Sequence, residues 1–178
     1  MEHSVLKFWF EELSAKDWFS RSDKLDEEIR QRFAGLHQQA IQGELYTWRS
    51  SAKGRLAEVI VLDQFSRNLF RDSPKAFAAD SMAIALAQEA VRIGSDKELT
   101  QLERSFLYMP YMHSESALIH KVAVELFEAN GQAGNTEYEY KHKAIIDRFG
   151  RYPHRNQVLD RQSTAEEIEF LKQPGSSF

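Results

Sequence analysis

Five of the nine residues 63–71 carry charged or amide side chains, and these types suit the binding of ions: Asp63, Gln64, Arg67, Asn68 and Arg71. At about 100° of rotation per residue, Asp63, Arg67 and Arg71 fall on one face of a helix. Because Asp63 and Arg67 are four residues apart, they can form a buried ion pair that fixes the helix register. Alternatively, the arginines face a cavity, where a guanidinium fork binds carboxylate or phosphate. We take Gln64, Arg67, Asn68 and Arg71 as candidate ligand-binding residues.

Residues 141–161 form a basic segment in an acidic protein. The segment carries a net charge of +4, although the whole chain has a net charge of −4. Such a segment attracts anions locally, and the alternative is a solvated basic loop. Phe149 and Tyr152 lie between the basic residues, which indicates that part of the segment packs against the protein. The candidate ligand-binding residues here are His142, Arg148, Arg151, Arg155 and Asn156. His142 also continues an apolar stripe, so a buried core histidine is its competing interpretation.

Residues 108–115 form a third polar cluster, in which Tyr108 is a candidate ligand-binding residue. Glu115 follows His113 closely, and a carboxylate beside an imidazole can serve in general acid–base catalysis. At the start of a helix, Glu115 also has a structural interpretation, since it interacts favourably with the helix dipole. The candidate acid–base residues are Asp63, His113, Glu115 and His154. The histidine spacing matches no strong metal signature, so we predict neither a metal nor a cofactor.

The elements that must position these residues are predicted to be helices. Apolar residues at helical spacing predict a helix that Ser22 or Asp23 caps and Gly43 ends. A second helix should cover residues 52–69. Ser73 and Pro74 should begin a third, which Gly94 ends.

Four further helices are predicted in the second half of the chain. One should run from Asp96 to about residue 108, where Pro110 interrupts the pattern. The next should run from Ser114 to residue 130, and another from Asn135 to about residue 149. Thr164 begins a capping-box pattern for the last one. Since no alternating β pattern occurs, we predict an all-α domain over residues 1–178, with about seven or eight helices in antiparallel pairs.

Composition excludes several classes of protein. A chain of 178 residues with 42% hydrophobic residues suits one globular domain. The absence of cysteine excludes a disulfide scaffold and a thiol nucleophile. The acidic net charge argues against a nucleic-acid binder. No membrane span or secretory signal is recognisable, so a cytoplasmic location is expected; the oligomeric state stays open.

Three motifs make the chain resemble a known family. Residues 62–71, 106–115 and 148–156 resemble the hallmarks of the bacterial family called domain of unknown function 924. The resemblance covers nearly the whole chain and implies a tetratricopeptide-like α–α superhelix without an established activity. Ser66 stands where the family usually has proline, and Asp160 where it usually has glycine.

Three functions follow as alternatives. The first is a pocket, rich in arginine and histidine, for a small anionic ligand or an acidic peptide end. The second is a hydrolase or transferase that acts on such an anion with a histidine–carboxylate pair. The third is a protein-interaction module in which the charged network is purely structural. No nucleic-acid or membrane partner is expected.

Overall fold

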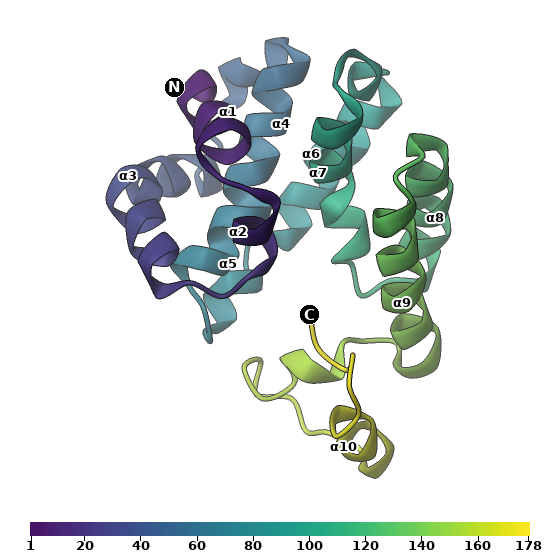
Figure 1. Cartoon of the computed structure of the whole chain (residues 1–178). Helices are drawn as coiled ribbons and strands as arrows, with labels where there is room; N and C mark the ends of the chain where they lie inside the picture. The colour runs from purple at the N-terminus through teal and green to yellow at the C-terminus, as the bar shows by residue number, and fades with distance from the viewer.

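The computed structural model describes residues 1–178, which form helices and turns but no β-strand (Figure 1). The all-α prediction is therefore confirmed. The α-helical segments are α1 (Glu2–Lys7), α2 (Ala15–Phe19), α3 (Asp23–Ile41), α4 (Ala52–Ile60), α5 (Ser66–Leu69), α6 (Asp80–Arg92), α7 (Gln101–Met112), α8 (Ala117–Asn130), α9 (Ala133–Phe149) and α10 (Ala165–Leu171). Short 3-10 helices cover Tyr46–Ser50, Pro74–Phe77, Ser95–Glu98 and Pro153–Arg155, and π-helical turns cover Phe8–Glu12 and Val61–Phe65.

Several helix ends lie where local sequence signals place them. The Ser22 hydroxyl accepts a hydrogen bond from the backbone N–H of Leu25 and caps α3. Thr164 begins α10 with the expected capping box. Gly131 ends α8 in the left-handed region, at a φ of 75°, which a glycine adopts without steric cost.

Other helix boundaries differ from the sequence expectation. Ser73 and Pro74 begin a 3-10 helix, and α6 begins only at Asp80. Pro110 does not interrupt α7, because every residue of its last two turns is buried and tertiary packing holds the helix together. The starts of α7, α8 and α9 also shift, since Thr100, Ser116 and Gln132 are the residues that precede them.

The core of the protein surrounds one continuous helical stretch made of α4, the π-helical turn Val61–Phe65 and α5. Its residues from Leu56 to Leu62 are almost completely buried, and all are apolar except Glu58, whose carboxylate binds Arg49. Phe65 contacts the rings of Phe8, Trp9 and Phe33, so the N-terminal segment and α3 pack on this stretch. A π-helical turn widens the helix and often occurs at functional sites; this one contains Asp63.

The helices contact their neighbours along the chain. The segment α7 packs against α6, α8 and α9, and α4 packs against α1, α6 and α7. Figure 1 shows α6 to α9 side by side, with the C-terminal segment and α10 beyond their ends. The tetratricopeptide-like superhelix stays a prediction. None of the helices combines the length and the apolar content that crossing a lipid bilayer requires.

Candidate functional site

Asp63 is the buried centre of the site, with 1% of its side chain exposed. Arg67 Nη1 donates a hydrogen bond to the backbone oxygen of Asp63 at 2.7 Å, and the same nitrogen lies 3.4 Å from Asp63 Oδ1. The same guanidinium binds both carboxylate oxygens of Asp80, at 3.0 and 3.1 Å. Burial alone would raise the pKa of Asp63, but the charge of Arg67 and the contact with His113 lower it well below the ordinary value. Asp63 is therefore ionised at neutral pH.

His113 is the cap residue at the C-terminal end of α7, and its side chain points at Asp63. The two atoms Nδ1 and Asp63 Oδ1 are 2.8 Å apart, whereas Nε2 makes no hydrogen bond within the chain. Burial lowers the pKa of His113, which favours the neutral ring at pH 7. In that state Nδ1–H donates to Asp63, and the lone pair on Nε2 is free to act as a base.

The turn that carries His113 is held by side chains from two other parts of the chain. Three consecutive backbone oxygens of this turn each accept a hydrogen bond: Met112 O from Tyr152 Oη at 2.6 Å, His113 O from Arg155 Nη2 at 3.0 Å, and Ser114 O from His120 Nε2 at 2.8 Å. Carbonyls at a helix C-terminus have no partners within the helix. The turn is consequently fixed from several sides, which fixes the direction of the imidazole.

Arg155 presents a guanidinium that is almost completely buried, at 7% exposure. Its charge lies over the rings of Phe77 and Tyr152, 4.5 and 4.6 Å from their centroids. Its nearest carboxylate oxygen belongs to Asp80, 3.6 Å from Nη1, and its Nε has no hydrogen-bond partner. Burial and the neighbouring Arg67 lower the pKa of Arg155 from its ordinary value. The positive charge is thus only weakly neutralised within the chain.

Glu115 is engaged by other groups and is not free to act as a base. It accepts a hydrogen bond from the backbone N–H of Tyr152 at 2.7 Å and two from Arg161, at 2.7 and 2.9 Å. Burial raises the pKa of this carboxyl, but the hydrogen bonds from Arg161 and Tyr152 N–H, together with the charges of Arg155 and Arg161, lower it below its ordinary value. Glu115 thereby connects the His113 turn to the basic segment.

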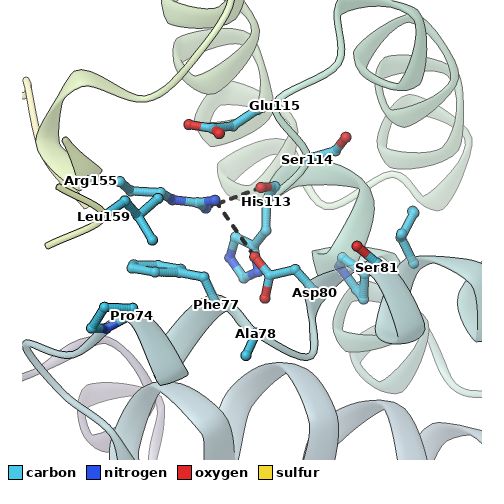
Figure 2. A pocket seen from close by; sticks show the side chains of 12 residues that line it. Pro74, Phe77, Ala78, Asp80, Ser81, His113, Ser114, Glu115, Arg155 and Leu159 are labelled. Atoms are coloured by element: carbon cyan, nitrogen blue, oxygen red, sulfur yellow. Dashed lines mark hydrogen bonds and ion pairs between the residues drawn. The ribbon is translucent and has the colours of Figure 1, made fainter. Parts of the chain in front are cut away.

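A cavity of about 330 Å³ opens between the start of α6, the end of α7 and the segment 155–159 (Figure 2). The guanidinium of Arg155 points at Asp80 and at the His113 turn, and Glu115 also lines the cavity. Phe77 and Leu159 supply apolar surface. This volume falls at the lower end of the range of small-molecule pockets.

No residue of the first predicted cluster, which comprises Asp63, Gln64, Arg67, Asn68 and Arg71, lines the cavity itself. Asn68 and Arg71 both donate to the carboxylate of Asp26 in α3, at distances of 2.6 to 2.8 Å. Arg71 leaves the predicted helix face because α5 ends two residues before it. Gln64 donates to Asp63 at 2.5 Å, and Tyr108 donates to Asp96 at 2.6 Å.

Two arginines of the basic segment form ion pairs with α10. Arg148 pairs with Glu166 on the surface, and Arg151 binds Glu167 with two hydrogen bonds. Asn156 donates to the same Glu167 at 3.3 Å. Of the candidates in this segment, Arg155 lines the cavity.

His142 and His154 lie together beside the C-terminal residue Phe178. The His142 ring stacks on Phe178 with 3.8 Å between centroids, and its Nδ1 is 2.7 Å from Tyr138 O. His154 Nδ1 is buried without a hydrogen-bond partner. Burial lowers the pKa of His142 to about 3 and that of His154 to about 4, so both rings are neutral in the folded protein at pH 7.

These two histidines should make the protein less stable in acid. Between their ordinary pKa of 6.5 and about 4, the unfolded chain binds more protons than the folded one. We expect the free energy of unfolding to fall by at least about 1 kcal/mol between about pH 7 and about pH 5, as measured by urea denaturation. His142→Gln should show a smaller fall. A free energy that stays constant over this interval in the native chain would contradict the assignment.

Asp80, Phe77 and His120 belong to the site although their sequence positions give no signal. Asp80 looks like an ordinary acidic residue in the first turn of a helix, and Phe77 like a core residue. His120 falls on a helix rim by periodicity, yet in the structure it is fully buried. No group of three or more histidine or acidic side chains in residues 1–178 is arranged to hold a metal ion.

Comparisons with known proteins agree with the resemblance in the motifs. The family model described as "Bacterial protein of unknown function (DUF924)" matches residues 5–175. A solved structure of a protein of unknown function, ATU0120 from Agrobacterium tumefaciens, is similar with a TM-score of 0.92 and 33% sequence identity, and the match covers 96% of each chain. No curated protein matches the chain. With almost its whole length matched, the chain belongs to this bacterial family of unknown function, DUF924.

Proposed function

We propose that the protein binds a small anionic molecule, or the acidic end of a peptide, in the cavity beside Arg155. The observation that carries the proposal is the state of this guanidinium. It is almost completely buried, but its nearest carboxylate is 3.6 Å away and already binds Arg67. A buried charge without a close partner is unfavourable. An anionic ligand would supply that partner.

The other free groups of the cavity support an anion as well. The carboxylates of Asp80 and Glu115 are occupied by arginines, so they offer little to a cationic ligand. No intramolecular hydrogen bond involves the hydroxyls of Ser81 and Ser114, and both residues line the cavity. Hydroxyls and a guanidinium fork are the donors that recognise carboxylate and phosphate.

A thermal-shift screen tests the proposal directly. Phosphate-bearing and carboxylate-bearing metabolites are added to the purified protein, with uncharged analogues of the same size as controls. A ligand that binds only the folded state raises the melting temperature. We expect charged members of matched pairs to raise it and their uncharged analogues to have no effect. Equal effects within each pair would contradict an anion site.

Asp80→Asn should strengthen the binding of inorganic phosphate. The substitution removes a negative charge beside the anion and releases Arg155 from its long contact with Asp80. We expect an affinity about three to ten times higher by isothermal titration calorimetry, which corresponds to about 1 kcal/mol. Asp147→Asn, which removes an exposed carboxylate of α9, is the matched control. Weaker binding by the correctly folded Asp80→Asn protein would count against the proposed position of the anion.

Acid–base catalysis at His113 is the second candidate function. It is favoured by one observation: Nδ1 is held 2.8 Å from Asp63, while Nε2 is unbonded beside a cavity. A carboxylate that orients a neutral imidazole is the usual arrangement of a general base. The test is a panel of phosphate esters and carboxylate esters with the native chain and with His113→Gln. Hydrolysis or transfer that persists unchanged in His113→Gln would exclude this role.

The third sequence hypothesis, a purely structural charge network, receives support from the pairs of Arg67, Arg71, Arg148, Arg151 and Arg161. Arg155 distinguishes it from the anion site. If the network is only structural, no anion should bind with a dependence on Arg155.

A further inference from the structure

His120 and Glu139 form a completely buried pair underneath the His113 turn. Both side chains have 0% exposure, and His120 Nδ1 lies 2.6 Å from Glu139 Oε1. The other nitrogen, Nε2, lies 2.8 Å from the backbone oxygen of Ser114 and 3.1 Å from Tyr152 Oη. The pair therefore links α9, through α8, to the residue that directly follows His113.

The hydrogen-bond partners determine where the protons of His120 lie. The Ser114 oxygen is a carbonyl and can only accept. Tyr152 Oη donates its proton to Met112 O, so towards His120 it can also only accept. Nε2 must consequently carry a proton. One further proton lies between His120 Nδ1 and Glu139 Oε1, bound either to the nitrogen or to the oxygen.

We infer that His120 is a positioning residue for the cavity: its Nε2–H holds the Ser114 carbonyl, and Glu139 fixes the ring so that Nε2 faces that carbonyl. The inference rests on the proposed function, because the turn it fixes carries His113 and lines the anion cavity. Outer hydrogen-bond partners commonly orient the groups that touch a ligand. His120 itself does not line the cavity.

Two substitutions separate this role from simple packing. In His120→Gln the side-chain amide reaches the place of Nε2 and keeps a donor for Ser114 O. In His120→Asn the amide reaches only the place of Nδ1 and keeps the contact with Glu139 alone. Each variant loses a buried hydrogen bond of His120, so urea denaturation should show stability losses of similar size in the two. Ser105→Ala is a further control, since Ser105 belongs to another buried hydrogen-bond network with Asn130 and Gln132.

Two measurements are made on the native chain and the three variants: the affinity for inorganic phosphate, and the NMR signals of the His113 imidazole. We expect His120→Asn to weaken phosphate binding by about tenfold and to shift the His113 signals. His120→Gln and Ser105→Ala should keep both properties close to the native ones. Native behaviour of His120→Asn, or equal changes in His120→Asn and His120→Gln, would overturn the inference. If the native chain does not bind phosphate, the proposed function fails, and the His113 signals alone decide on His120.

Discussion

Replacing Arg155 with lysine is expected to weaken the binding of inorganic phosphate by at least about tenfold, the effect of losing one charge-assisted hydrogen bond. Lysine keeps the positive charge, but it lacks the planar fork that stacks between Phe77 and Tyr152 and points at the cavity. The expected loss therefore reflects geometry more than charge. Isothermal titration calorimetry at constant ionic strength measures it, since salt screens the attraction.

The matched control is Arg148→Lys. Arg148 belongs to the same basic segment but is exposed, pairs with Glu166 and does not line the cavity. We expect the phosphate affinity of this variant to equal that of the native chain. If both substitutions reduce the affinity equally, the anion is attracted by the general charge of the segment, and the specific site beside Arg155 is wrong.

Asp63→Asn is expected to lower the free energy of unfolding by about 3–5 kcal/mol, as happens when one partner of a buried ion pair is removed. The side chain keeps its size, but Arg67 loses one of its two carboxylates, and the Nδ1–H of His113 is left with a neutral amide oxygen in place of a carboxylate. Urea denaturation at neutral pH measures the loss. Asp147→Asn is the control, because its exposed pair with Lys143 should contribute less than about 1 kcal/mol.

The pH dependence of this difference provides a second check. The pKa of Asp63 is lower in the folded protein than its ordinary value of 3.8. Its contribution is therefore fully present above pH 3.8 and is lost as the pH falls towards the folded value. The native chain and Asp63→Asn should converge in stability only in strong acid. A difference that disappears already near neutral pH would show that the charge of Asp63 is not what stabilises the fold.

Local signals predicted much of the fold. Helix caps such as Ser22 and Thr164 act within three residues of themselves, so the sequence contains everything that determines them. The direct Asp63–Arg67 pair was predictable for the same reason, from a spacing of four residues. Pro110 shows the limit of such rules, because packing around α7 outweighs its local preference.

The residues that meet at the site come from segments far apart in the sequence, so local patterns could not predict which of them would be neighbours. Asp80 meets Arg67 and Arg155 because the start of α6 lies beside both α5 and the 3-10 helix Pro153–Arg155. Arg161 binds Glu115 across 46 residues of sequence. Asp160 adopts a φ of 52°, in the left-handed region that glycine adopts without steric cost. No periodicity in the sequence predicts the ion pairs of Asp80 or the pair between Arg161 and Glu115.

The most direct test of the anion site is an NMR titration of the native chain with inorganic phosphate. It follows the Nε–H signal of Arg155, which has no partner within the chain, together with the His113 imidazole. The anion site requires both signals to shift and to saturate with one common Kd, while the Arg148 signal stays unchanged. If Arg155 and His113 do not respond, or respond without saturation and in parallel with Arg148, the protein has no anion site in this cavity.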